Sequence, residues 1–198
     1  ITDELIETVK NCSKVCEYFH IPMQSGNSDI LKAMNRRYNY EEYANIVKKI
    51  RDTFENVTIT SDFIAGFPGE TEEQFCDTLK AIETLELDYS NTAAYSPREK
   101  TVAAKWVDKF IDEKTKKERL ARLNAKNREI CLLSNKKFVG KTLEILVENA
   151  EIRNGKCILN GRARNNKIVH FEGEEDQIGC FVNVKIDSAK TWYLTGKQ

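Results

Sequence analysis

The chain has 198 residues with 31 basic and 31 acidic side chains, so its formal net charge is zero at neutral pH. A balanced charge gives no general attraction to nucleic acids or membranes, no apolar run is long enough to span a bilayer, and no secretory signal opens the sequence. These features indicate a globular protein of the cytoplasm. Because the sequence starts without methionine, apparently inside an amphipathic helix, we expect it to be a piece of a longer polypeptide.

In the first part of the chain, apolar runs typical of buried strands end in short polar or glycine-containing loops that lead into helices. Two such units in series predict a parallel α/β sheet, in which ligands bind at the carboxyl ends of the strands. The predicted elements are a helix at 2–11, a strand at 15–23, a short helix after Asn27, a helix at 40–54, a strand at 57–64, a helix at 70–85 and a strand at 89–95.

The second part begins with a long predicted helix at 112–136. Its cations greatly outnumber its acids, which predicts either a basic binding face or a solvated linker helix. After Gly140 the helical periodicity stops, and short β-rich runs with turn signals predict a small antiparallel barrel of roughly five strands. We therefore expect one domain at 1–137 and a second at 138–198. The predicted strands are 143–147, 155–159, 168–171, 181–186 and 192–194.

Two loops after predicted strands offer groups that a ligand could use. The first carries Gln24, Ser25 and Gly26, which supply an amide, a hydroxyl and an uncluttered backbone. Before the second loop, Ile64 would give an apolar wall for an adenine ring, and Gly66 permits close backbone approach. Ordinary strand-to-helix connections remain an alternative for both loops.

Cationic and aromatic residues follow at the same predicted strand ends. The third strand leads into Tyr95 and Arg98, and Arg36 and Arg37 come after the first loop. Arginines in such positions commonly pair with phosphate or carboxylate groups.

Residues 161–171 combine three cations with no acid and end in Phe171. Basic side chains in such a hairpin could follow RNA phosphates while Phe171 stacks on a base. An ordinary charged hairpin with Phe171 in the core is an equally good interpretation. The candidate RNA-contact residues are Arg162, Arg164, Asn165, Asn166 and Lys167.

Taken in order, the motifs at 20–26, 34–38, 61–71 and 95–98 resemble the barrel motifs of the radical S-adenosylmethionine (SAM) methylthiotransferase family. The C-terminal part is similar to a TRAM domain, the RNA-binding module of that family. The resemblance implies an α/β fold in which the C-terminal half of a TIM-like radical SAM barrel precedes a small OB-like antiparallel barrel.

The basic segment at 162–167 favours the branch of the family that acts on tRNA. That branch methylthiolates C2 of N6-isopentenyladenosine beside the anticodon, so the implied partner is the tRNA anticodon stem-loop. The resemblance implies SAM and two 4Fe-4S clusters as cofactors. One cluster, on a CxxxCxxC motif, generates the deoxyadenosyl radical that abstracts hydrogen from the adenine, and the other delivers sulfur.

Neither set of cluster cysteines is present, so this chain should be inactive by itself and should need an N-terminal cluster domain and the first half of the barrel. Cys12 and Cys16 have CxxxC spacing, but Phe19 occupies the third ligand position, and we expect reduced thiols that are not ligands. Lys100 also departs from the family, which usually has Gly in the same turn.

The resemblance further implies roles for individual residues. Those expected to line the SAM side of the barrel are Gln24, Ser61, Asp62, Ile64 and Tyr95. Those expected to face RNA or the missing domain are Arg36, Arg37 and Arg98, with Arg162, Arg164, Asn165, Asn166 and Lys167 gripping the stem-loop.

Three alternatives remain open. One is the related enzyme that methylthiolates an aspartate of a ribosomal protein, although its terminal barrel would need less basic charge. Another is a stand-alone RNA-binding module with the half barrel as a scaffold. A complete barrel that binds a sugar phosphate or cofactor is the third, and the chain has too few predicted strands for it.

Overall fold

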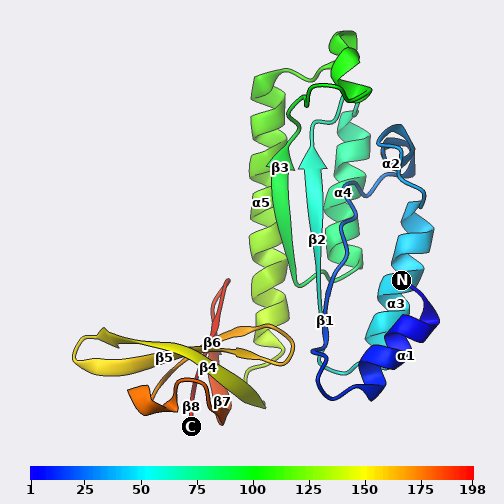
Figure 1. Cartoon of the computed structure of the whole chain (residues 1–198). Helices are drawn as coiled ribbons and strands as arrows, with labels where there is room; N and C mark the ends of the chain where they lie inside the picture. Colours follow the sequence, from blue (N-terminus) through cyan, green and yellow to red (C-terminus); the bar gives the residue numbers. More distant parts are fainter. The chain divides into compact units, whose positions relative to one another are not determined.

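The computed structural model describes all residues, 1–198, and divides into two compact units. One unit comprises 20–52 and 59–130, and the other comprises 1–19, 53–58 and 131–198. None of the helices has the length and apolar character needed to cross a membrane. The elements in chain order (Figure 1) are α1 (Asp3–Asn11), β1 (Tyr18–His20), α2 (Ser28–Ala33), α3 (Tyr40–Thr53), β2 (Thr58–Ala65), α4 (Glu72–Thr84), β3 (Tyr89–Ala94), η1 (Ala103–Lys105), η2 (Val107–Lys109), α5 (Glu113–Lys136), β4 (Thr142–Arg153), β5 (Lys156–Ala163), β6 (Ile168–Glu172), η3 (Glu175–Gln177), β7 (Phe181–Ala189) and β8 (Leu194–Lys197).

The first three strands form one sheet in the order β1-β2-β3, and β2 and β3 run parallel as predicted. The first strand is much shorter than the predicted 15–23. A turn precedes it, in which the Val15 N–H donates to Cys12 O, and Pro22 after it has no N–H for a strand ladder. After this strand, Gln24 forms an isolated parallel bridge to Phe63 of β2.

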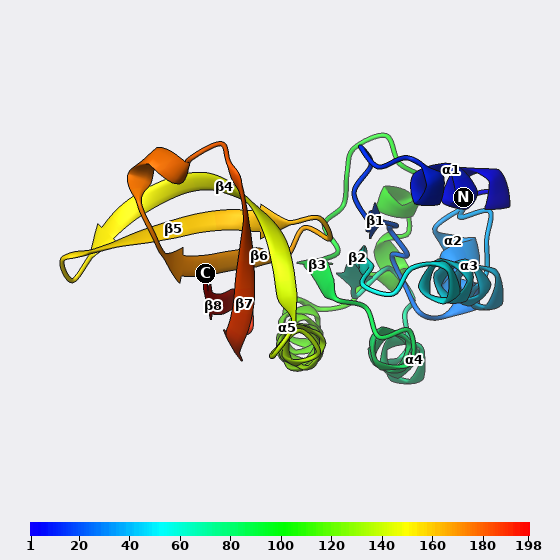
Figure 2. The ribbon, with the colours of Figure 1, turned by 90° about the horizontal axis from the view of Figure 1, so that it is seen from below.

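The two faces of β2 have different surroundings. Phe63 and Ala65 are buried, whereas Asp62 and Ile64, which point to the opposite face, are partly exposed. Helices α4 and α5 lie along one face of the sheet (Figures 1 and 2). The face that carries Ile64 is therefore less covered, and it is the face available to a ligand.

The last five strands close into a barrel in the order β4-β5-β6-β8-β7. Asn154 and Gly155, both at positive φ (52° and 76°), form the two-residue turn between β4 and β5, as expected for a type I′ hairpin. The predicted five-stranded barrel is confirmed, but the prediction of purely antiparallel pairing is wrong because β6 and β8 are parallel. The barrel core contains Ile145, Val147, Leu159, Val169, Phe171, Val184, Ile186 and Leu194.

Candidate functional site

A cavity of about 640 Å³ lies where β2 and β3 end, and we call it the strand-end cavity. Its lining brings together Gln24, Ile64 and Tyr95, which the sequence predicted for SAM, and Arg36 and Arg98, which it predicted for RNA. Its volume is in the range of sites for small organic ligands and cofactors. The lining that sequence reasoning did not identify includes Met34, Asn35, Phe67, Ala93, Ala94 and the segment 101–103.

Gln24 has the left-handed backbone conformation that non-glycine residues seldom adopt, with φ of 77°. Its N–H donates to Asp62 O at 2.8 Å, and its carbonyl accepts from Ile64 N at 3.0 Å. Such conformations cost of order 1–3 kcal/mol and persist where surrounding contacts enforce them, often at functional sites. Here two hydrogen bonds to β2 hold Gln24 at the cavity wall.

Tyr95 combines apolar packing with a polar group that has no partner. Its ring packs edge-on against Phe67 and Phe110, with centroids 5.3 and 6.2 Å away. The Tyr95 hydroxyl oxygen is buried without a hydrogen-bond partner. An unsatisfied buried hydroxyl costs roughly 1–3 kcal/mol, so this oxygen destabilises the unliganded chain.

The loop after β2 is held by a buried ion pair. The Glu70 carboxylate accepts from the Gly66 N–H at 2.8 Å and from Arg119 Nη1 at 2.8 Å. Arg119 Nη1 also donates to the Glu70 carbonyl at 3.0 Å. Burial raises the pKa of Glu70, against the opposing effects of the Gly66 N–H and of Arg119. The sequence suggested only that Glu70 begins a helix, whereas the helix N-cap is Thr71.

A second residue of α5 reaches the end of β3. The buried Lys116 donates from Nζ to Tyr95 O at 3.2 Å. Its aliphatic chain packs so closely on Gly66, at φ of 75°, that a Cβ there would collide with it. We call Lys116 and Arg119 the α5 clamp. The sequence suggested that both residues belong to an exposed basic face of the helix, but both side chains are buried.

Two predicted SAM residues do not line the strand-end cavity. Ser61 is fully buried, and its hydroxyl accepts from Met23 N at 2.9 Å. Asp62 accepts from Asn91 Nδ2 at 3.0 Å and lies 3.4 Å from His20 Nε2. Both side chains thus connect neighbouring strands.

The first predicted ligand loop turns partly away from the cavity. Ser25 is fully buried, and the Gly26 N–H donates to Thr78 Oγ1 of α4 at 2.9 Å. A Cβ at Gly26 would approach the Asp77 carbonyl to 2.6 Å, so this glycine permits close packing on α4. Arg37 is exposed and is not part of the cavity lining.

The predicted RNA-contact hairpin divides into exposed and buried parts. Arg162 is exposed and donates to Glu148 Oε2 at 3.2 Å and Asn166 Oδ1 at 2.8 Å. Asn165 and Lys167 are buried. Phe171 lies in the barrel core, so the stacking role considered for it is wrong and the alternative, a core position, is confirmed.

The other hairpin side chains bind elements of their own unit. Arg164 donates to Glu17 at 3.3 Å and to Val15 O at 2.9 Å. Asn165 Nδ2 donates to Asn56 O at 2.9 Å, and Lys167 Nζ donates to Ser134 Oγ at 2.9 Å. These contacts give the hairpin a structural role in addition to any role in binding.

The six cysteines are all free thiols. No group of three or more histidine, cysteine, aspartate or glutamate side chains is arranged to hold a metal ion. The residues present therefore do not fit an iron–sulfur cluster.

Two family models match the chain. Residues 1–82 match the radical SAM superfamily, and residues 136–198 match the TRAM domain. A solved structure, coproporphyrinogen III oxidase (HemN) of Escherichia coli, described as a radical SAM enzyme, superposes with a TM-score of 0.55 over 83% of this chain and 44% of its own. At 13% sequence identity that likeness concerns the fold alone.

Curated relatives align with this chain over essentially its whole length. Proteins named tRNA-2-methylthio-N(6)-dimethylallyladenosine synthase are 45% identical in Acetivibrio thermocellus, over 99% of this chain, and 46% identical in Alkaliphilus oremlandii, over 100%. The chain spans 40% and 41% of the lengths of those two relatives. The chain is therefore similar, over its whole length, to about two fifths of these synthases, and it carries a radical SAM match followed by a TRAM match.

Proposed function

We propose that this chain is part of an enzyme that methylthiolates C2 of N6-isopentenyladenosine next to the anticodon of tRNA. The observation that supports this most strongly is 45–46% identity over essentially the whole chain to relatives with the synthase name. In this proposal, 1–137 is the C-terminal half of a TIM-like radical SAM barrel, and 138–198 is an OB-like TRAM barrel.

The strand-end cavity is the proposed SAM site. Its lining combines the apolar side chain of Ile64, the amide of Gln24 and the aromatic residue Tyr95, which together suit a nucleoside. When bound, SAM supplies the carbon radical that removes hydrogen from the substrate adenine. The chain's residues orient the nucleoside, and Ser61 and Asp62 support the strands behind it.

The proposed RNA contacts are of two kinds. Arg36 and Arg98 line the strand-end cavity, and Arg37 is exposed nearby in sequence. At the barrel hairpin, Arg162 and Asn166 would meet the anticodon stem-loop directly. Arg164, Asn165 and Lys167 would fix the hairpin shape through their contacts within the unit.

Since no metal-ligand group is present in this chain, the two 4Fe-4S clusters of the proposed enzyme would be bound by other segments of the longer protein. We therefore propose that this chain alone is inactive and that its contribution is to bind SAM and tRNA. The cytoplasmic location expected from the sequence stays a prediction.

The test is to express the whole protein that contains this chain in cells lacking the 2-methylthio modification, and to analyse tRNA nucleosides by mass spectrometry. Appearance of 2-methylthio-N6-isopentenyladenosine is the expected result. Unmodified tRNA together with a methylthiolated aspartate on a ribosomal protein would overturn the proposal and support the related enzyme. If neither the tRNA nor the ribosomal protein is methylthiolated, although the protein is folded and its clusters are present, the proposal is also overturned.

A further inference from the structure

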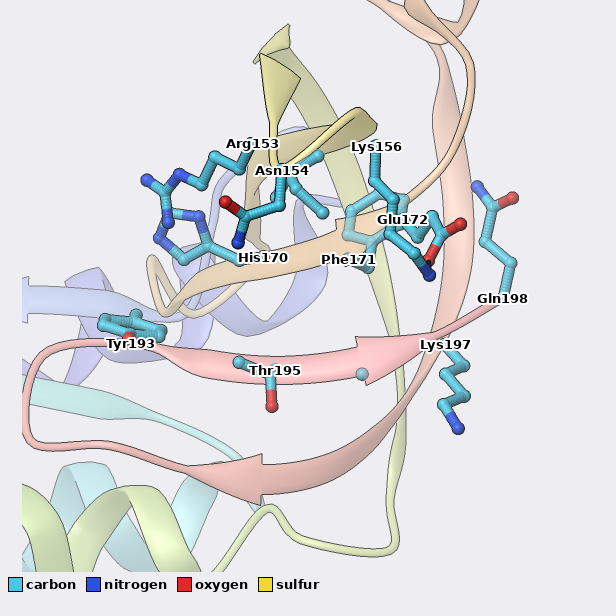
Figure 3. A pocket seen from close by; sticks show the side chains of 12 residues that line it. Arg153, Asn154, Lys156, His170, Phe171, Glu172, Tyr193, Thr195, Lys197 and Gln198 are labelled. Carbon is cyan, nitrogen blue, oxygen red and sulfur yellow. Dashed lines mark hydrogen bonds and ion pairs between the residues drawn. The ribbon is translucent and has the colours of Figure 1, made fainter. Parts of the chain in front are cut away.

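A second cavity, of about 610 Å³, lies on the five-stranded barrel, and we call it the barrel cavity. Its lining comes from the β4–β5 turn, from β6 and from β8 (Figure 3). His170 and Phe171 close the segment 161–171, but none of the candidate RNA-contact residues at 162–167 lines this cavity. The residues on which the argument depends are Arg153, Lys156, His170, Tyr193 and Lys197.

Two aromatic rings form one side of the barrel cavity. His170 and Tyr193 meet nearly edge-on, with ring centroids 4.6 Å apart and an interplanar angle of 74°. Both side chains are half-buried. Figure 3 shows His170 on β6 and Tyr193 directly before β8, and Arg153 lines the same cavity. Exposed aromatic faces on small barrels are the usual platforms for unpaired bases.

The His170 ring has an unused hydrogen-bonding atom. Its Nδ1 is buried and has no partner in the protein. Burial, and to a lesser extent the charge of Arg153, lower the pKa of His170 from 6.5, so the ring is mainly neutral at pH 7 and has one donor and one acceptor nitrogen. Nδ1 is not accessible from the cavity, so the contribution of this half-buried, neutral ring is to pack against a base.

The charge around the barrel cavity is mainly positive. Arg153, Lys156 and Lys197 line it, with Glu172 as the acidic residue in the lining. Lys156 binds Glu172 at 2.7 Å and Arg153 pairs with Glu151, while Lys197 is exposed and makes no ion pair. Exposed ion pairs are weak, of order 0–1 kcal/mol, so these cations can exchange their partners for phosphate.

The exposed arginine of the hairpin, Arg162, lies on the same outer face of the barrel as His170. Along β5, Leu159 and Ala163 point into the core, so Asn160 and Arg162 point outward. The register pairs Asn160 with His170 and Arg162 with Ile168. Arg162 and His170 therefore lie on the same outer face. A single pair, Gly161 and Val169, separates the pair that contains Arg162 from the pair that contains His170.

We propose that the barrel cavity binds one unstacked nucleotide of single-stranded RNA, with the base against Tyr193 and His170 and the flanking phosphates at Arg153, Lys156 and Lys197. This inference rests on the proposed tRNA function and adds to it a base-binding pocket separate from the predicted hairpin contacts. A loop nucleotide fits better than duplex RNA, because the bases of a duplex are stacked and unavailable.

The first experiment measures binding of the 198-residue chain to a fluorescent, isopentenylated anticodon stem-loop by anisotropy. Because stacking contributes roughly 1–3 kcal/mol per base, Tyr193→Leu should weaken binding about 5- to 150-fold, and Tyr193→Phe should leave it nearly unchanged. Lys10→Gln, an exposed cation of α1 outside the lining, is the matched charge control for Arg153→Gln and Lys156→Gln. Those two changes should each weaken binding and reduce the salt slope by about one, and Lys10→Gln should not.

The second experiment maps contacts directly. Stem-loops carrying 4-thiouridine at single loop positions are photo-crosslinked to the chain, and modified peptides are identified by mass spectrometry. Crosslinks at or beside His170 or Tyr193 support the proposal. Strong binding that is unchanged by Tyr193→Leu, with crosslinks confined to 162–167, overturns the pocket and leaves the tRNA function intact. Absence of binding by the unsubstituted chain overturns the pocket and the other tRNA contacts proposed for this chain, while methylthiolation by the whole protein decides the function separately.

Discussion

Arg119 of α5 binds Glu70 of the loop after β2 at 2.8 Å, with side-chain exposures of only 6% and 0%. The same carboxylate accepts the Gly66 N–H, and Lys116, one turn earlier on α5, donates to the end of β3. The α5 clamp thus fixes both strand ends that line the proposed SAM site. The two residues are 49 positions apart in the sequence.

Arg119→Leu should destabilise the chain by roughly 3–5 kcal/mol, because it leaves the Glu70 carboxylate buried without its cation. Urea unfolding followed by circular dichroism measures this. Arg128→Leu, at an exposed position of the same helix, should change stability by less than about 0.5 kcal/mol. A similar small effect for Arg119→Leu would show that the ion pair does not hold the loop.

Glu70 should also give a measurable pH dependence. Because its folded pKa is raised above 4.5 by burial, the carboxyl contributes stability that is fully present below pH 4.5 and is lost as the pH rises through the folded pKa. The stability of the natural chain relative to Glu70→Gln should therefore fall as pH rises from about 4 to 7. Unfolding free energies of the two chains across that range test the sign, and a rising difference contradicts it.

Tyr95→Phe should stabilise the unliganded chain by about 1 kcal/mol, because it removes a buried hydroxyl without a partner. Tyr38→Phe is the matched contrast. The Tyr38 hydroxyl donates to Pro22 O at 2.9 Å, so its loss should cost about 1 kcal/mol. Equal losses at both positions would show that the Tyr95 hydroxyl has a partner.

Lys100→Gly should stabilise the chain or leave its stability unchanged. Lys100 has φ of 69°, and the left-handed region costs a non-glycine residue roughly 1 kcal/mol. Glycine avoids this cost in the folded chain, but its greater freedom in the unfolded chain partly offsets the gain in stability. Glu99→Gly, next to it and without positive φ, should lose about 0.5–1 kcal/mol. Thermal unfolding of both variants decides the matter, and equal losses would mean that Lys100 is unstrained.

His170 should titrate below 6.5 in the folded chain, since burial and Arg153 disfavour its charged form. The chain has two histidines, so the imidazole resonances can be assigned with His170→Gln and followed by NMR. A lowered folded pKa contributes stability that is present above pH 6.5 and is lost as the pH falls through the folded value. As the pH falls through this range, the natural chain should lose stability relative to His170→Gln. A folded pKa of His170 at or above 6.5 would contradict the burial of the ring.

The alternation of buried strands and capped helices allowed the parallel sheet to be predicted, and the turn signals after Gly140 allowed the five-stranded barrel. The motifs at strand ends also identified three residues that line the strand-end cavity, Gln24, Ile64 and Tyr95, and their role in binding SAM stays a prediction. These features are local in the sequence, because strand period, turn residues and the position of a loop after a strand depend on neighbouring residues.

Local patterns did not separate ligand-facing groups from structural ones. Ser61, Ser25 and Gly26 look like ligand groups in the sequence, but they pack against other elements because the opposite face of the sheet is covered. Likewise, Lys167 is a hairpin cation whose place is decided by a hydroxyl from α5.

The sequence by itself determined the order of elements and the segment that forms each loop, because periodicity and motif order are properties of the chain. Only the tertiary structure decided which side chains meet. Lys116 and Arg119 belong to a basic run whose composition suits a solvated helix, yet they are buried because Tyr95 O and the Glu70 carboxylate lie opposite them. His170 and Tyr193 share a cavity because β6 and β8 pair in parallel, a long-range pairing that no local pattern encodes.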